Sequence, residues 1–137
     1  MIGARNVIKG TVKDIKKGTI NGIVKVDVGG GITLSSNCSI ESIEQLGLTT
    51  GKEVQVIVKA MEVMLANEKL NIGARNQVEG TVCEIKRGTI NCLVKIKTSN
   101  GLIFSSNLSL ESVDQLGIKE GQTAVAIFKA MNVLLMV

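Results

Sequence analysis

The amino-acid sequence contains one segment twice, and this internal repeat constrains the fold more than any other feature. The matched segments are IGARN at 2–6 and 72–76, GTIN at 18–21 and 88–91, SSN at 35–37 and 105–107, and KAM at 59–61 and 129–131. Every pair is offset by 70 residues without a gap, and about half of the aligned positions are identical. Such self-similarity indicates repeated structural units. We therefore predict two domains of one fold, at 1–67 and 68–137, with the second copy of the repeat beginning at residue 71.

Each unit is small for a domain that folds alone. A chain of about 65 residues buries only ~60% of the surface that it exposes when unfolded. The three cysteines, Cys38, Cys83 and Cys92, are an odd number without CxxC spacing, which argues against a disulfide framework or a zinc cluster. We interpret them as small buried or half-buried thiols. Association remains as a source of stability, and we predict a homo-oligomer.

The residue pattern of one unit predicts five short strands and one helix. Strands are expected at 6–15, with a bend or bulge at Gly10, and at 19–28, 32–37, 54–58 and 61–65, with turns at 16–18, 29–31 and 48–51. Ser39 is typical of a helix N-cap and Gly47 of the residue after a helix, so a helix is expected at 40–46. The fold class predicted is all-β with one short helix per repeat. Two tandem OB-like Greek-key β-barrels fit this order of elements, although the strand count also fits an SH3-like barrel.

Catalysis finds no support among the residue types. The sequence has no histidine, which removes the commonest general base and the commonest metal ligand. No serine or cysteine is paired with a base at a recognisable spacing. Asp14, Asp27, Glu41 and Glu44 are interpreted as solvated carboxylates on strand ends and a helix face. We expect no enzyme, no catalytic cofactor and no metal held directly by side chains.

Charge and hydropathy limit the partners. The net charge is +4, with lysines and arginines dispersed along the chain, which suits an anionic partner of any size. Only Phe104 and Phe128 are aromatic, whereas single-stranded nucleic acids are usually bound by several stacking aromatic side chains. No apolar run is long enough to span a membrane, and the N-terminal segment MIGARNVIKG lacks an apolar signal core. We expect a cytoplasmic protein without a nucleic-acid or membrane partner.

Several polar positions are kept in both copies of the repeat. They are Arg5 and Arg75, Lys59 and Lys129, Ser39 and Ser42, and Ser109 and Ser112. Guanidinium, ammonium and hydroxyl groups all donate hydrogen bonds, and a tetrahedral dianion has oxygens that only accept. Each residue also has an ordinary interpretation, since Ser39 and Ser109 can be N-caps and the others exposed polar groups. By themselves, these positions suggest anion binding and leave the anion open.

Each repeat resembles the Mop domain of the molbindins, and the two-copy arrangement resembles a di-Mop molbindin. The resemblance covers nearly the whole chain twice. It is carried by the opening GARN, where the family usually has SARN, by the KGTIN segment, by the S-x-x-S-x-x-x-LGL-x-x-G helix and turn, and by the closing Lys-Ala after an apolar strand.

This resemblance implies an OB-like barrel that assembles into oligomers, with molybdate or tungstate bound between domains. It implies binding by Gly3, Ala4, Arg5, Lys59 and Ala60 of one domain, and by the corresponding Gly73, Ala74, Arg75, Lys129 and Ala130. The neighbouring domain is implied to contribute Ser39 and Ser42, or Ser109 and Ser112. The implied protein stores or buffers the oxyanion in the cytoplasm, and two-copy members are trimers.

The chain departs from the family at one position, because Gly3 and Gly73 replace a serine. Loss of one hydrogen bond to a charged group costs roughly 1.5–3 kcal/mol, which weakens binding without abolishing it. Two alternatives remain open at this point. One is an OB-type nucleic-acid-binding protein, and the other is a free-standing sensory module of molybdate-responsive regulation.

Overall fold

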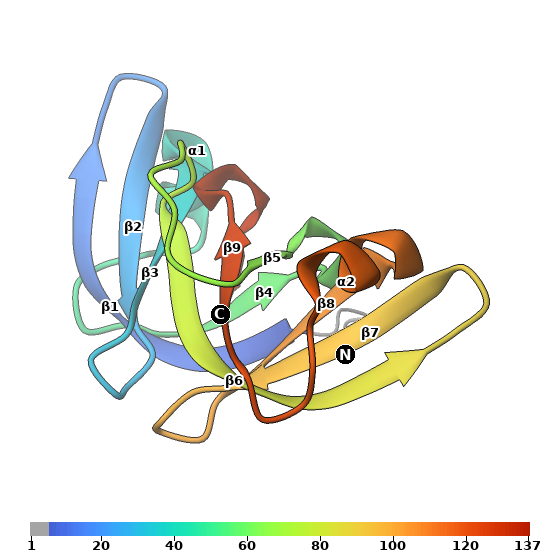
Figure 1. The fold of residues 1–137 in the computed structure, drawn as a ribbon. Helices are drawn as coiled ribbons and strands as arrows, with labels where there is room; N and C mark the ends of the chain where they lie inside the picture. Colours follow the sequence, from blue (N-terminus) through green and yellow to red (C-terminus); the bar gives the residue numbers. More distant parts are fainter. Residues whose placement is uncertain (1–5) are drawn as a thin grey trace.

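The computed structural model describes residues 6–137, which form two five-stranded antiparallel sheets (Figure 1). The first repeat contains β1 (Asn6–Lys17), β2 (Asn21–Asp27), β3 (Thr33–Ser39), α1 (Ile40–Gln45), β4 (Glu53–Val58), the 3-10 helix η1 (Ala60–Glu62) and β5 (Met64–Ala66). The second contains β6 (Asn76–Arg87), β7 (Asn91–Lys97), β8 (Ile103–Ser109), α2 (Leu110–Leu116), β9 (Thr123–Phe128), the 3-10 helix η2 (Ala130–Asn132) and β10 (Leu134–Met136). The predicted all-β class with one short α-helix per repeat is confirmed.

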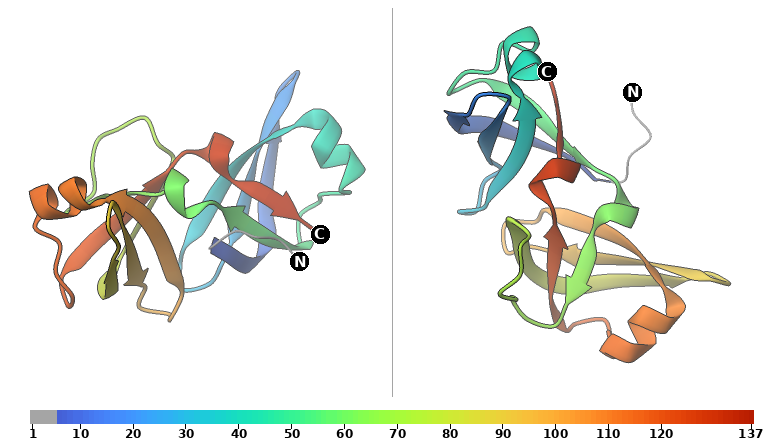
Figure 2. Two further views of the ribbon diagram at one scale, coloured as in Figure 1. Left: turned by 90° about the vertical axis from the view of Figure 1, so that its right-hand side faces the viewer. Right: turned by 90° about the horizontal axis from the view of Figure 1, so that it is seen from above.

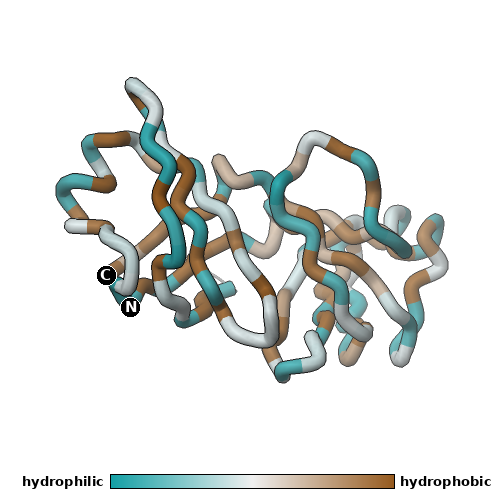
Figure 3. The backbone as a smooth tube through the Cα atoms, turned by 90° about the vertical axis from the view of Figure 1, so that its left-hand side faces the viewer, coloured by the Kyte–Doolittle hydropathy of each residue, from teal (hydrophilic) through white to brown (hydrophobic). Residues whose placement is uncertain are grey.

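Alternation of apolar and polar residues produces the strands. In β2, Gly22, Val24 and Val26 are buried while Lys25 and Asp27 face solvent, and Figure 3 shows the same alternation of hydropathy along neighbouring strands. This is the period of two expected for a strand with one face in the core. The buried side chains of both repeats form one continuous apolar cluster, so the repeats share a core.

The repeats exchange their last strands. β5 of the first repeat pairs with β9 of the second, and β10 of the second repeat pairs with β4 of the first. The strand orders are therefore β10-β4-β1-β2-β3 and β5-β9-β6-β7-β8, and Figure 2 shows the C-terminal strand lying beside the sheet of the first repeat. β10 also contacts β3, and β5 contacts β8, which closes each sheet toward a barrel. Each barrel needs both repeats to be complete.

Two details of the predicted first and fifth strands were wrong. β1 continues to Lys17, past the turn expected at 16–18, and the shift in its register lies between Val12 and Asp14. Gly10 allows a close approach between strands, because a Cβ there would lie 2.5 Å from a Val26 methyl group and 2.9 Å from the Asp27 carbonyl oxygen. The strand expected at 61–65 begins as η1 and continues as β5.

The hairpin turns after β2 and β7 differ for a packing reason. The turn at 29–31 is Gly-Gly-Gly, and the equivalent turn at 99–101 is Ser-Asn-Gly. Gly30 has φ +63°, and a Cβ there would lie 2.5 Å from the Asn100 side-chain carbon. The two turns therefore meet at the junction of the repeats, and only one of them has room for a side chain.

Candidate functional site

The arginine and lysine of the second repeat that match Arg5 and Lys59 of the first are Arg75 and Lys129, which lie side by side at the end of the sheet. Asn76 of β6 pairs with Phe128 of β9 as the last pair of that ladder, so Arg75 and Lys129 are the next residues on adjacent strands. Both are exposed. The ion pairs within residues 6–137 are Arg87–Asp114 and Lys95–Glu84, and neither involves this pair. Two cations without a carboxylate partner form a local positive site.

Small buried residues hold this cationic pair in place. Ala74 packs against Val125 and Ile127 on the outer face of β9, which fixes the segment that leads to Arg75. Ala130 is buried directly after Lys129. In the first repeat, Asn6 pairs with Val58, which is followed by the exposed Lys59 and the buried Ala60. The expected site residues Gly3, Ala4 and Arg5 lie outside the described residues, and Gly73 is exposed.

The serines that occur in both repeats form hydrogen-bonded pairs, one at the start of each α-helix. Ser39 is the N-cap of α1, and its hydroxyl accepts from the Ser42 N–H at 3.0 Å and donates to Ser42 Oγ at 2.8 Å. Ser109 and Ser112 repeat this at α2, at 3.1 and 2.8 Å. The predicted N-caps are therefore confirmed. The proton of Ser39 is used within the pair, which leaves the hydroxyl proton of Ser42 available for a ligand.

These bonds predict different roles for the two serines of a pair. Replacing Ser39 with alanine removes the N-cap and is expected to lower the free energy of unfolding by ~1 kcal/mol. Replacing Ser42 with alanine leaves the cap in place, so we expect an unfolding free energy within about 0.5 kcal/mol of the original. Urea unfolding of the two variants checks the order, and equal losses in both would contradict it.

A small cavity lies beside the first serine pair. It has a volume of about 170 Å³. Its lining comes from the end of β3, the start of α1 and the exchanged segment of the second repeat: Asn37, Cys38, Ser39, Ser42, Leu46, Val133, Leu134 and Leu135. The lining supplies hydroxyl groups and apolar walls but no cation. An anion held there needs its charge partner from elsewhere.

Two asparagine clamps, Asn76 with Ser35 and Asn6 with Ser105, join the two repeats at the edge strands β3 and β8. The Asn76 amide accepts from the Ser35 N–H at 2.8 Å and donates to the Ser35 carbonyl at 2.9 Å. Asn6 does the same with Ser105, at 2.7 and 2.9 Å. Both asparagines are buried. Each clamp therefore attaches the Arg-Asn segment of one repeat to the outer strand of the other.

Serine hydroxyls add a second attachment beside each clamp. Ser36 Oγ donates to the Val133 carbonyl at 2.6 Å, and Ser106 Oγ donates to the Val63 carbonyl. These bonds hold η1 and η2, which begin at the alanine of each Lys-Ala pair, against the edge strand of the other repeat. Sequence reasoning did not assign Asn6, Asn76 or the SSN serines to any role. The signal was present, because both motifs are identical in the two copies.

Within one chain, Arg75 and Lys129 lie at the ends of β6 and β9, near the point where Asn76 meets β3, whereas the Ser39–Ser42 pair lies at the end of β3. Asn76 is hydrogen-bonded to β3 at Ser35, and Ser39 lies four residues further along that strand. Ser35 and Ser39 are therefore about 13 Å apart, at ~3.3 Å per residue. No hydrogen bond within residues 6–137 joins Arg75 or Lys129 to either serine pair. The chain therefore presents two kinds of partial site, one cationic and one with hydroxyl groups.

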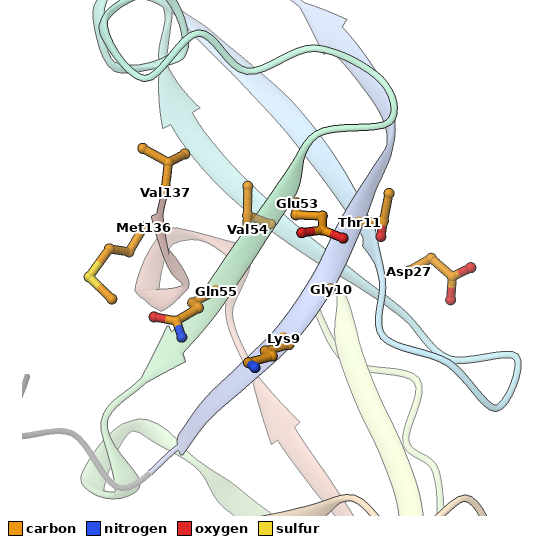
Figure 4. Close-up of a pocket in the computed structure, with 9 residues that line it drawn as sticks. All are labelled: Lys9, Gly10, Thr11, Asp27, Glu53, Val54, Gln55, Met136 and Val137. Carbon is orange, nitrogen blue, oxygen red and sulfur yellow. The ribbon is translucent and has the colours of Figure 1, made fainter. Parts of the chain in front are cut away.

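A larger cavity lies elsewhere, on the outer face of β1 and β4 (Figure 4). Its volume is about 680 Å³, and it is lined by Lys9, Gly10, Thr11, Asp27, Glu53, Val54, Gln55, Met136 and Val137. The lining has two carboxylates for one ammonium group. It contains none of the site residues expected from the sequence, and its charge does not favour an oxyanion.

The cysteines differ in their surroundings. Cys92 is buried and Cys38 half-buried, as expected, but Cys83 is exposed, so the prediction was wrong for that residue. Burial raises the pKa of the Cys92 thiol above its ordinary value. Among the described residues, no three histidine, cysteine, aspartate or glutamate side chains gather to hold a metal ion. Nor does that part of the chain contain a helix long and apolar enough to cross a membrane.

Comparison with known families identifies the same unit twice. The sequence profile of the TOBE domain matches residues 3–65 and 73–135. The two matched ranges correspond to the two repeats and include both Arg-Asn segments, both serine pairs and both Lys-Ala pairs.

Individual relatives and a solved structure agree with this match. The molybdenum transport protein ModE of Azotobacter vinelandii is 33% identical over 135 residues, which are 98% of this chain and 50% of that protein. A probable molybdenum-pterin-binding protein of Haemophilus influenzae is 46% identical over 67 residues, 49% of this chain and 97% of that protein. The chain spans about half the length of the ModE proteins that it matches along its own length. The cytoplasmic molybdate-binding protein ModG, solved with molybdate bound, superposes with a TM-score of 0.96 at 40% identity, covering 99% of this chain and 98% of that one.

Proposed function

The chain belongs to the TOBE domain family, with one domain in each repeat, and from this premise we propose that it binds molybdate or tungstate for cytoplasmic storage and homeostasis, without catalysis. The observation that carries the proposal is the 40% identity and 0.96 TM-score with a molybdate-bound protein over nearly the full length of both chains. The unpaired cations at the ends of the sheets supply the chemistry that such an ion requires.

We assign the ligand contacts to two sources. Arg75 and Lys129 provide charge, and Gly73, Ala74 and Ala130 bring backbone groups. The Ser39–Ser42 pair of another domain contributes its hydroxyl groups, with the Ser42 proton free to donate to the ligand. Arg5, Lys59, Gly3, Ala4 and Ala60, with Ser109 and Ser112, form the equivalent set. The separation of the cationic and serine groups within one chain supports a ligand held between domains of different copies.

The experiment that tests this function is calorimetric titration with molybdate, tungstate, sulfate and phosphate. Donors spaced for a large tetrahedral ion cannot all close on the smaller sulfate. We therefore expect molybdate and tungstate to bind with similar affinity and sulfate at least about tenfold more weakly, a difference of ~1.4 kcal/mol. Equal binding of sulfate and molybdate would contradict selection by size, and no heat with molybdate would contradict the function.

Exposed apolar side chains support assembly into a homo-oligomer, for which we propose a trimer. Ile20 and Ile90 are 75% and 77% exposed, and Met61 and Met131 are 70% and 66% exposed, yet both pairs are identical in the two repeats. The Ile20 carbonyl accepts from the Ile40 N–H at 2.9 Å, so this isoleucine lies beside the serine pair. The methionines follow the Lys-Ala pairs. Each partial site thus has an apolar neighbour suited to exclude water from an interface.

Light scattering over a range of protein concentrations tests the assembly. We expect the wild-type chain to have about three times the mass of a single chain, and Ile20→Ser with Ile90→Ser to dissociate toward smaller species. Leu70→Ser changes an apolar residue that is 43% exposed in the joint between the repeats, and serves as the control. A wild-type mass of one chain at every concentration would contradict the proposal.

Restoring the family's serine is expected to strengthen binding. Gly73 replaces that serine, and a Cβ at this position would have no heavy atom within 4 Å, so a hydroxyl group can be added without a clash. One new hydrogen bond to a charged ligand contributes about 1.5–3 kcal/mol, which corresponds to an affinity roughly tenfold to a hundredfold higher. Titration of Gly73→Ser with molybdate measures the gain, with Gly73→Ala as the control that lacks the hydroxyl. A gain that is equal in both variants would remove the hydroxyl from the explanation.

The nucleic-acid alternative is not favoured. Phe104 and Phe128, the only aromatic residues, are fully buried and stack on one another with ring centroids 6.0 Å apart. The chain therefore offers no aromatic surface on which bases could stack.

A further inference from the structure

The 3-10 turns η1 and η2, which follow the equivalent lysines Lys59 and Lys129, differ in charge at one position. The first reads Lys59-Ala60-Met61-Glu62-Val63, and the second reads Lys129-Ala130-Met131-Asn132-Val133. Four of the five residues are identical, so the difference between Glu62 and Asn132 is confined to one side chain. A carboxylate in one turn thus replaces a neutral amide in the other.

The geometry of the turns brings this residue close to the lysine. Glu62 N–H donates to the Lys59 carbonyl at 2.9 Å, and Asn132 N–H donates to the Lys129 carbonyl at 3.0 Å. Lys59 and Lys129 are the extended N-cap residues of η1 and η2, and Glu62 and Asn132 are the last residues of those single turns, about 6 Å further along the turn axis. Glu62 and Asn132 are half-buried while both lysines are exposed. The side chain at this position therefore lies one turn from the lysine, where its charge can influence an ion that the lysine binds.

Hydrogen bonds to the other repeat also hold both turns in place. The carbonyl of Val63, directly after Glu62, accepts a hydrogen bond from Ser106 Oγ. The carbonyl of Val133, directly after Asn132, accepts one from Ser36 Oγ. Both contacts are made to the edge strand of the other repeat. Neither lysine belongs to an ion pair within residues 6–137, so Glu62 does not fully neutralise Lys59 but remains a negative charge near it.

We propose that the two lysine turns form oxyanion sites of unequal affinity, and that Glu62 is the residue that sets the difference. This inference rests on the proposed function. A dianion at the Lys59 turn is repelled by the Glu62 carboxylate, whereas one at the Lys129 turn meets an Asn132 amide that can donate a hydrogen bond. The site at Lys129 is filled first, and the site at Lys59 is filled at higher oxyanion concentration.

Calorimetric titration of the full chain with molybdate tests the inference through an exchange of the two residues. We expect two phases in the wild-type chain, separated by about tenfold in affinity or more. Glu62→Asn should bring the phases together by strengthening the weaker one, and Asn132→Glu should weaken the stronger one. The double exchange should restore two phases. Glu68→Gln removes an exposed carboxylate from the joint between the repeats and should leave both phases unchanged.

The outcomes separate this inference from the proposed function. If every variant binds molybdate and the separation of the phases does not depend on residues 62 and 132, the inference is overturned and the function stands. If Glu68→Gln changes the phases as much as Glu62→Asn, net charge explains the effect and the inference is overturned. If the wild-type chain does not bind molybdate, the proposed function falls and the inference with it. Narrowing of the separation at high salt supports an electrostatic origin.

Discussion

Replacing Asn76 with alanine is expected to lower the free energy of unfolding by about 2–4 kcal/mol, because two half-buried backbone groups lose their partner, each in the lower half of the roughly 1–3 kcal/mol that a buried group costs. The side chain of Asn76 satisfies both the N–H and the carbonyl of Ser35 on the other repeat, and it is buried. Asn6→Ala should have a similar effect through Ser105. Urea or thermal unfolding monitored by circular dichroism measures both.

The matched control for this prediction is Asn107→Ala. Asn107 is also a strand asparagine, but it is exposed, so its replacement should change stability by no more than about 0.5 kcal/mol. The two clamps also act on the same junction. Their double mutant should therefore depart from the sum of the single effects, as residues that share one interface do. Equal stability of Asn76→Ala and Asn107→Ala would show that the clamp contributes nothing.

The combined substitution Arg75→Ala and Lys129→Ala should weaken molybdate binding at its site by a hundredfold or more, since each charged hydrogen bond contributes about 1.5–3 kcal/mol. The two side chains are adjacent, exposed and outside the core, so the fold should tolerate their loss. Titration with molybdate measures affinity, and thermal unfolding without ligand confirms that the variant is folded.

A control must remove the same charge elsewhere. Lys13 and Lys97 are exposed and lie on other parts of the sheets, and their joint replacement by alanine also lowers the net charge by two. If general attraction of anions were sufficient, both double variants would lose affinity equally. We expect the control to retain affinity within a few-fold at physiological salt, where charges more than about 8 Å apart are largely screened. Unchanged binding in the Arg75 and Lys129 variant would remove these cations from the site.

Local patterns predicted most of the elements correctly. Ser39 as a helix N-cap, the alternating strand at β2 and the glycine turn at 29–31 all depend on interactions between residues close in sequence. The errors arose where distant residues decide the outcome. At Gly10 the sequence indicated only a bend or bulge, because a glycine in a strand often marks one, and it did not reveal the close approach of β2 to β1.

The candidate site was predictable in its residue types but not in its arrangement. Duplication within one chain made Arg75, Lys129 and the serine pairs recognisable, since each appears twice at the same spacing. The same comparison could have identified Asn76, which is equally repeated. Its role was missed because a side chain that completes the hydrogen bonds of an edge strand has no characteristic sequence pattern.

The amino-acid sequence by itself determined that there are two copies of one β-rich unit, where their strands and helices lie to within a few residues, and which side chains can donate to an anion. Only the tertiary structure decided that β5 and β10 change places between the barrels, that asparagines join the repeats, and that the cations beside β6 and β9 lie apart from the serine pair at the end of β3. The physical reason is that repeat pattern and alternation are local properties of the chain. Pairing of β10 with β4 or with β9 satisfies the same backbone hydrogen bonds and the same apolar pattern, so the choice is made by the packing of the whole molecule.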